Sequence, residues 1–141
     1  METEQKDQVL NNKPLNNRKV LWVEDDVLLG EIIAKKFSGT NTTLLHAVDS
    51  IEAFKILENE TPDIIFLDIL LPGMSGYEIL EKLKSEEQTK DIPVIILSNF
   101  GQKSEVDKGI KLGAEKFLIK ATITLDEVFS EAERILQSKS R

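Results

Sequence analysis

Polar side chains that could do chemistry stand directly after four apolar runs of the sequence. Glu24 and Asp25 follow the first run, and Asp68 follows the third. Ser98 and Lys120 follow the fourth and fifth. If these runs are parallel strands of one sheet, their carboxyl ends share an edge, and ligand sites in open α/β sheets lie at that edge. Three carboxylates, a hydroxyl and an ammonium group would then meet in one crevice.

The charges of this set indicate what else the crevice would hold. Two carboxylates ~4 Å apart repel by about 4 kcal/mol at an effective dielectric of ~20, so three of them require cations. Lys120 offsets one negative charge, and a divalent metal would offset the other two. Because all the ligands are oxygens, Mg²⁺ is expected first and Mn²⁺ second. A carboxylate can also act as a nucleophile toward phosphorus, so the residues outline a phosphoryl-transfer site.

Short apolar runs and segments of helical spacing alternate along the chain. A helical pattern follows each run, and capping boxes at 75–78 and 124–127 mark two of the helix starts. This alternation is typical of a parallel sheet with helices on both faces. The first, third, fourth and fifth runs are apolar throughout, so we expect them to be buried on both faces. The five runs lie at 20–23, 42–45, 64–67, 94–97 and 117–119.

The composition is that of an ordinary one-domain protein, and it excludes several classes. The 141 residues carry 18 basic and 25 acidic side chains, a net charge of −7, which argues against direct nucleic-acid binding. The absence of cysteine excludes a disulfide framework, a zinc finger and a thiol nucleophile. The apolar runs are far shorter than the ~20 residues of a membrane span, and no secretory signal precedes them. We therefore expect no membrane partner and a cytoplasmic location.

The distribution of apolar residues sets the expected boundaries. Residues 1–17 contain few apolar side chains and are predicted to form a flexible leader. The predicted domain spans 18–138, and 139–141 form a C-terminal tail. Within the fourth helical pattern, Gly109 costs ~1 kcal/mol relative to alanine, so this helix is expected to be the least stable.

Taken together, the residues at the strand ends resemble the receiver domain of two-component response regulators, in its stand-alone form. The resemblance covers roughly 19–137. The segment 68–76 is similar to the family's D-x-x-M-P-x-M-x-G loop, and the pair 113–114 is similar to its G-A pair before the last strand. Glu24–Asp25 matches the acidic pair of that family, and Asp68 matches its phosphoacceptor. Ser98 matches the Ser/Thr position, Phe117 the aromatic switch position and Lys120 the lysine.

The resemblance implies a fold and a metal-dependent reaction. The fold would be flavodoxin-like, a doubly wound sheet of five parallel strands in the order 2-1-3-4-5 with five helices. Asp25, Asp68 and the backbone carbonyl of Leu70 would ligate Mg²⁺, with Glu24 acting through water. Asp68 would accept a phosphoryl group from a sensor histidine kinase, a phosphotransfer protein or a small donor such as acetyl phosphate. Lys120 would neutralise the transferred group.

The resemblance also implies a conformational switch. Phosphorylation would draw Ser98 toward the phosphoryl oxygens, Phe117 would turn into the space left behind, and the face of the fourth helix, fifth strand and fifth helix would change. The protein would then signal to a separate effector protein, as a monomer or a weak phosphorylation-dependent dimer. It would be a switch and not an enzyme, although it would catalyse its own phosphoryl transfer and slow dephosphorylation.

Four positions bear on how closely the chain follows the family pattern. Ala121 replaces the proline that follows the family's lysine, so the peptide bond before it is either strained cis or trans. Asn99 stands where a small residue is common and would narrow the entrance for small donors. Leu70 and Phe100 occupy positions that help or hinder the hydrolytic water. Both are apolar, which predicts slow self-dephosphorylation.

Other functions are weaker matches to the same residues. A flavin binder would need a phosphate cradle without carboxylates after the first strand. A haloacid-dehalogenase-type phosphatase would need a D-x-D pair after the first strand, and a Toprim-like nuclease would need one after the third strand. The chain has a D-x-D pair at neither position. The serious alternative is a non-phosphorylated pseudo-receiver that acts purely as an interaction module.

Several further residues have simpler interpretations. Asp26 is assigned to capping a helix. His46 is interpreted as a partly exposed strand-end residue and not as a ligand, since no second histidine or cysteine accompanies it. Trp22 and Phe66 are expected in the core. A solvated face, or alternatively a partner-docking surface, would carry Lys103, Lys108, Lys111 and Lys116.

Overall fold

The computed structural model describes residues 14–99 and 101–139. Its five strands are all parallel and lie in the order β2-β1-β3-β4-β5. Helices alternate with the strands along the chain, which confirms the flavodoxin-like fold class predicted above. The elements are β1 Lys19–Val23, α2 Val27–Phe37, β2 Thr43–Ala47, α3 Ser50–Leu57, β3 Ile64–Asp68, α4 Gly76–Ser85, β4 Val94–Ser98, α5 Lys103–Lys111, β5 Lys116–Ile119, the 3₁₀ turn η1 Lys120–Thr122, and α6 Leu125–Lys139.

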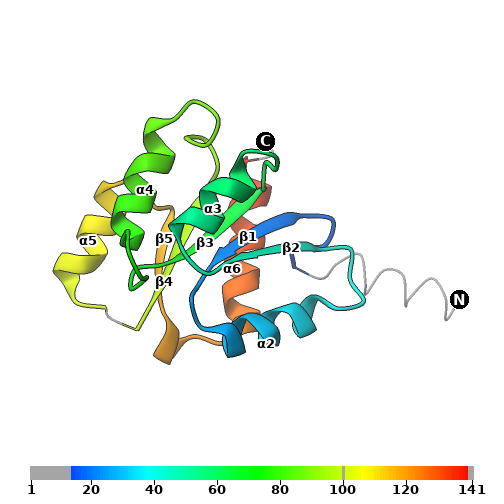
Figure 1. The fold of residues 1–141 in the computed structure, drawn as a ribbon. Helices are drawn as coiled ribbons and strands as arrows, with labels where there is room; N and C mark the ends of the chain where they lie inside the picture. The colour runs from blue at the N-terminus through cyan, green and yellow to red at the C-terminus, as the bar shows by residue number, and fades with distance from the viewer. Residues whose placement is uncertain (1–13, 100, 140–141) are drawn as a thin grey trace, which may run out of the picture.

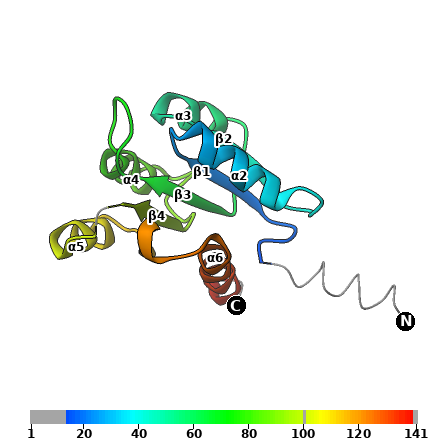
Figure 2. The same ribbon diagram turned by 90° about the horizontal axis from the view of Figure 1, so that it is seen from below.

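The helices form a layer on each face of the sheet, with α2 and α6 on one face and α3, α4 and α5 on the other (Figures 1 and 2). Alternate residues of a strand point to opposite faces, so each strand supplies both layers. We call the α2/α6 layer the aromatic side. Its buried cluster comprises Leu15, Val20, Trp22, Ile33, Phe37, Ile64, Phe66, Ile95, Leu97, Val128, Phe129, Ala132 and Leu136.

The opposite layer, which we call the aliphatic side, is built from the other set of strand residues. Trp22 and Phe66 are both buried, on the aromatic side, which confirms the prediction that they lie in the core. The buried cluster of the aliphatic side comprises Leu21, Val23, Ala47, Ala53, Ile65, Leu67, Ile69, Ile79, Leu80, Leu83, Ile92, Val94, Ile96 and Ala114.

Burial differs between the central and the outer strands. Every residue of β3 and β4 is buried, and β1 is buried after Lys19, as expected. The expectation that the fifth strand is buried on both faces is wrong. Lys116 of β5 is exposed and the rest of the strand is only half-buried, because β5 lies at the edge of the sheet and has one strand neighbour.

Both predicted boundaries differ from the packed part of the chain. Leu15, which falls in the predicted leader 1–17, has no exposed surface and belongs to the aromatic side. Its carbonyl accepts hydrogen bonds from Arg18 N (3.0 Å) and Thr42 Oγ1 (2.8 Å). At the other end, α6 continues through Lys139, whose ammonium group pairs with Glu115 at 2.8 Å. Residues 1–13 of the predicted leader and 140–141 of the predicted tail lie outside the described residues.

Most helix starts have a side-chain cap, and α5 is the exception. Asp26, Asp49 and Ser75 each accept a hydrogen bond from the backbone N–H three residues later, which confirms the capping assignment of Asp26. Thr124 does the same before α6. Gln102, which precedes α5, makes no such bond. Across the described residues, none of the helices combines the length and hydropathy that a membrane span requires.

Candidate functional site

Three carboxylates meet at the carboxyl edge of the sheet. Glu24 and Asp25 follow β1, and Asp68 is the last residue of the adjacent strand β3. One carboxylate oxygen from each of the three lies within 4.8 Å of the other two. Glu24 and Asp68 are 2% and 9% exposed, whereas Asp25 is open to solvent. Two buried anionic groups and one accessible one therefore surround a single point.

Lys120 reaches this point from the far edge of the sheet. The chain leaves β5 through the 3₁₀ turn η1, which begins at Lys120. Its ammonium group contacts the carboxylate of Glu24 directly and lies 3.3 Å from Asp68 Oδ2. One ammonium group is thus shared by two carboxylates, and the net formal charge of the four groups is negative.

The ionisation of the site reflects this imbalance. Burial raises the pKa of Glu24 above its usual value, and the nearby charge of Asp68 raises it further, against the opposing effect of Lys120. Burial alone would lower the pKa of Lys120, but its contacts with Glu24 and Asp68 together raise it. The raised pKa of Lys120 reflects the two carboxylates around its ammonium group, and by count the three carboxylates carry more negative charge than this one cation balances. A second cation would lower the energy of this arrangement.

The backbone around the carboxylates is tightly constrained. Gly76 begins α4 directly against the end of β3, where an added Cβ would lie 2.2 Å from the carbonyl oxygen of Asp68. Only glycine allows that approach. The N–H of Leu70 donates to Asp68 Oδ1 at 3.4 Å, while the Leu70 side chain is 58% exposed beside the site.

Ser98 and Phe117 lie on the strands next to Asp68. Ser98 is buried and ends β4, one residue beyond Leu97, which is the register partner of Asp68. Phe117 is half-buried on β5 and packs against the aliphatic side. The structure therefore brings Glu24, Asp25, Asp68 and Lys120 together and places Ser98 on the adjoining strand end. The roles predicted for Ser98 and Phe117, and for the Leu70 carbonyl, stay predictions.

The positions that depart from the family pattern are only partly described. The Lys120–Ala121 peptide bond is trans, and Ala121 is exposed. Asn99 is also exposed. Phe100 lies outside the described residues, so its predicted influence on hydrolysis has no structural counterpart.

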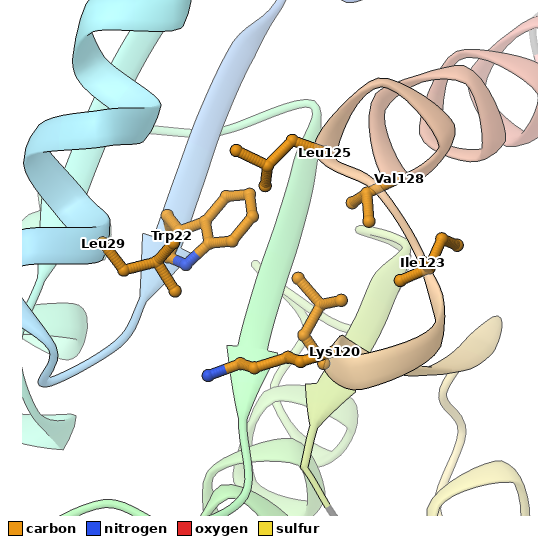
Figure 3. Close-up of a pocket in the computed structure, with 7 residues that line it drawn as sticks. Trp22, Leu29, Lys120, Ile123, Leu125 and Val128 are labelled. Atoms are coloured by element: carbon orange, nitrogen blue, oxygen red, sulfur yellow. The ribbon is translucent and has the colours of Figure 1, made fainter.

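An apolar pocket of about 240 Å³ adjoins the site on the aromatic side (Figure 3). Its walls come from β1, β4, α2 and the start of α6, and the stem of Lys120 runs along its rim. The lining residues are Trp22, Leu29, Leu97, Lys120, Ile123, Leu125 and Val128. The stem of Lys120 is thus supported by apolar packing while its ammonium group points to the carboxylates.

His46 contacts this edge of the sheet, and no sequence pattern predicted that contact. His46 of β2 is half-buried, and its Nε2 lies 2.7 Å from the carbonyl oxygen of Glu24. Its half-burial on β2 agrees with the partly exposed strand position expected above. A single histidine without a partnering motif gives no sequence signal for such a backbone contact.

Comparison with known proteins agrees with this geometry. The family model of the response regulator receiver domain matches residues 20–132. The phosphate regulon transcriptional regulatory protein PhoB of Pseudomonas aeruginosa is 33% identical over 103 residues, which cover 73% of this chain and 45% of PhoB. The chain spans between 34% and 51% of the length of the curated relatives that it matches first.

Solved structures give the same result. The receiver domain of the Francisella response regulator 1452 is 28% identical, with a TM-score of 0.77, covering 88% of this chain and 99% of that one. The receiver domain of the sensor histidine kinase PA1611 of Pseudomonas aeruginosa, which holds a magnesium ion in its active-site cleft, shares the fold at 23% identity, with a TM-score of 0.69 and coverage of 86% and 95%. On its sequence match and its fold, the chain belongs to the response regulator receiver domain family, the receivers of two-component signalling.

Proposed function

We propose that Asp68 accepts a phosphoryl group in a Mg²⁺-dependent step of a two-component phosphorelay. The observation that carries this proposal is the pairing of Lys120 with both Glu24 and Asp68 inside a cluster of three carboxylates. A purely structural ion pair would need one carboxylate for one ammonium group. Two buried carboxylates and a third, accessible one surround a single lysine, which leaves an excess of negative charge. A hard divalent cation would balance this excess.

The residues present divide the work of the transfer among them. A carboxylate oxygen of Asp68 would form a bond to phosphorus while the bond from phosphorus to the donor's imidazole nitrogen, or to the acetate oxygen of acetyl phosphate, breaks. Lys120 would pair with the incoming phosphoryl oxygens, and the Ser98 hydroxyl would donate to one of them. Mg²⁺ bound by Asp25, Asp68 and the Leu70 carbonyl would neutralise phosphoryl charge. Glu24, which is nearly fully buried, would act on the metal through water and hold Lys120 in place.

The environment of Asp68 also bears on the lifetime of its phosphorylated form. The Leu70 side chain is apolar and exposed beside the site, so it offers no group to orient a hydrolytic water. We expect slow self-dephosphorylation, and a phosphoryl half-life of seconds would contradict this. On this account the protein is a signalling switch and not an enzyme that turns over a substrate.

The partners proposed follow from the family. A sensor histidine kinase or phosphotransfer protein would supply the phosphoryl group in the cytoplasm, and a separate effector protein would read the phosphorylated form, with the receiver acting as a monomer or a weak phosphorylation-dependent dimer. The chain covers only part of its regulatory relatives, so the transcriptional regulation named for proteins such as PhoB is not extended to it.

The direct test is the mass of the intact protein after incubation with Mg²⁺ and acetyl phosphate. We expect the gain of one phosphoryl group, no gain when EDTA replaces Mg²⁺, and no gain in Asp68→Asn. Asp91→Asn is the matched control, because Asp91 is an exposed aspartate just before β4, at the opposite edge of the sheet. Absence of any gain with acetyl phosphate and with phosphorylated kinase would favour the pseudo-receiver alternative.

A further inference from the structure

His46 contacts the loop that carries Glu24 and Asp25, which we call the acidic loop, and the proposed chemistry does not use this contact. The Nε2 atom of its imidazole ring lies 2.7 Å from the backbone carbonyl oxygen of Glu24. A carbonyl oxygen can only accept a hydrogen bond, so Nε2 must carry the hydrogen and donate it. His46 is the register partner of Trp22 on the neighbouring strand, which places the ring on the aromatic side of the sheet.

Helix α2 leaves a space for this ring at Gly30. A Cβ atom added to Gly30 would lie 2.6 Å from Cε1 and 2.9 Å from Nδ1 of His46, so no other residue fits there without moving the imidazole. Glycine in the interior of a helix is less favourable than alanine. The helix thus carries an unfavourable residue at the one point where the ring packs. The N–H of Gly30 also donates to Asp26 O at 3.0 Å, which joins the same turn to the acidic loop.

The consequence for the site follows from the planarity of the peptide group. The N–H of Glu24 donates to Ala47 O at 2.9 Å, and its carbonyl accepts from His46, so β2 holds Glu24 at both backbone groups. The plane that contains this carbonyl also contains the N and Cα atoms of Asp25. Fixing the direction of the Glu24 carbonyl therefore fixes the position of the Asp25 Cα atom. The side chain of Asp25 is the exposed member of the carboxylate cluster.

We propose that His46, seated against Gly30, is a positioning residue that holds the Glu24–Asp25 loop in the arrangement that binds Mg²⁺. This inference rests on the proposed metal site, and it adds that the edge strand β2 and helix α2 contribute to metal affinity without touching the metal. Groups that orient metal ligands from behind affect metal affinity strongly in proteins.

The test compares the Mg²⁺ affinity of four variants with that of the wild type, in the absence of any phosphodonor. The titration follows the amide NMR signals of residues 24–27 and 68–70. His46→Leu removes the donor, and His46→Gln keeps an N–H donor near the place of Nε2. Gly30→Ala leaves the histidine in the chain but displaces its ring. Leu44→Ala is the matched control, because Leu44 is half-buried on the same face of β2, two residues earlier, and packs in the aromatic side.

We expect His46→Leu and Gly30→Ala to weaken Mg²⁺ binding by about tenfold, the lower end of the effect seen for groups that orient metal ligands. His46→Gln should recover most of the affinity, and Leu44→Ala should bind Mg²⁺ like the wild type even where its melting temperature is lower. If His46→Leu loses no more affinity than Leu44→Ala, or if His46→Gln behaves like His46→Leu, the positioning role is wrong.

A second readout needs no metal. In metal-free protein, hydrogen exchange at the amides of residues 25–28 should be faster in His46→Leu than in the wild type, and close to the wild type in His46→Gln. Equal exchange in all three would also overturn the inference. Wild-type protein that fails to bind Mg²⁺ would instead contradict the proposed function itself, so the two failures are distinguishable.

Discussion

The two sides of the sheet are packed in different ways, although the same strands supply both. On the aromatic side, the rings of Trp22 and Phe66 stack with their centroids 4.6 Å apart, and Phe37 and Phe129 approach equally closely. Phe129 also meets Trp22 and Phe66 edge to face, at 6.3 and 6.5 Å. Large rings in such geometries contribute both buried area and specific contacts. Helices α2 and α6 are therefore firmly joined to the sheet.

The aliphatic side is looser where α5 covers it. Within Lys103–Lys111, all of which the structure describes, Gly109 is the only buried residue. The helix start lacks a side-chain cap at Gln102. Its ties to α4 include the Tyr77 hydroxyl, which donates to Glu105 O at 3.0 Å, and the Lys108 ammonium group, which lies 4.4 Å from the centre of the Tyr77 ring. Few apolar side chains hold this helix in place.

This difference indicates where a change at Asp68 could spread. The stem of Lys120 and the acidic loop pack against the aromatic side. Ser98 ends β4, and Phe117 packs on the aliphatic side next to Gly109 of α5. A rearrangement that repacks α5 disturbs little buried area, and one that moves α2 or α6 would break the aromatic contacts. We therefore expect the aromatic side to anchor the site, and the change expected above for the face of α5, β5 and α6 to lie mainly in α5 and β5.

The largest expected effect comes from removing one ring on each side. Phe129→Ala should lower the free energy of unfolding by roughly 3–5 kcal/mol, as for other fully buried aromatic residues. Phe117→Ala should cost about half of that or less, because its ring is half-buried. Urea denaturation of the two variants measures both values. Equal losses would remove the distinction between the two sides.

Hydrogen exchange of the native protein tests the same contrast without mutation. The amides of α5 should open with a free energy below that of α6, since local opening follows the number of buried apolar contacts. Mass spectrometry of peptides covering 103–111 and 125–139 compares the two helices directly. Exchange that places α5 among the best protected elements would contradict this expectation.

A smaller effect is expected from Gly109→Ala. The new Cβ would lie 2.7 Å from Ile96 Cδ1 and 3.1 Å from Phe117 Cδ2, so both side chains must shift slightly. Alanine also gains about 1 kcal/mol of helix propensity over glycine. The two effects should nearly cancel, leaving the free energy of unfolding within about 1 kcal/mol of the wild type. The ring signals of Phe117 should nevertheless shift in NMR spectra, and a loss of several kcal/mol in urea would show that α5 is more firmly packed than described.

The smallest effect concerns two lysines, one at the site and one on α4. Contacts with Glu24 and Asp68 outweigh burial and raise the pKa of Lys120 above the ordinary 10.5. Burial lowers the pKa of Lys84, whose ammonium group donates to two backbone carbonyls at 2.8 and 3.0 Å. The stability from Lys120 is therefore complete below the ordinary pKa and is lost as pH rises through its raised folded-state pKa. The unfavourable burial of charged Lys84 is relieved as pH rises through its lowered pKa.

NMR titration of the lysine side-chain methylene groups next to nitrogen measures both values. Lys84 should release its proton at a lower pH than Lys120. Coincident or reversed titrations would mean that the two ammonium groups do not differ in their surroundings as the contacts indicate.

The sequence predicted the sheet and the charged site for the same reason. Apolar runs identify buried parallel strands, and a polar residue directly after such a run lies at the carboxyl edge, so Glu24, Asp68 and Lys120 could be placed together without a structure. The apolar run 117–119 by itself indicates a fully buried strand, and the half-burial of β5 follows only when the order 2-1-3-4-5 implied by the resemblance is used to place this strand at the edge of the sheet.

Single side chains that act through shape were not predictable. Leu15 is one apolar residue among polar neighbours, so it gives no periodic signal, yet it is fully buried. His46 and Gly30 lie 16 positions apart and become partners only when β2 pairs with β1 beneath α2. Neither residue carries a pattern that would link it to the other or to Glu24.

We expect the proposed phosphorylation of Asp68 to change the aliphatic side at α5 and β5 while the aromatic side stays in place. The most direct measurement is peptide-resolved hydrogen exchange of the wild type and of Asp68→Asn, each with and without acetyl phosphate and Mg²⁺. We expect a change only in the wild type, largest in the peptides that span α5 and β5 and small in those that span α2 and α6. A change of the same size in Asp68→Asn, or one that falls equally on α2 and α6, would contradict the expected pattern.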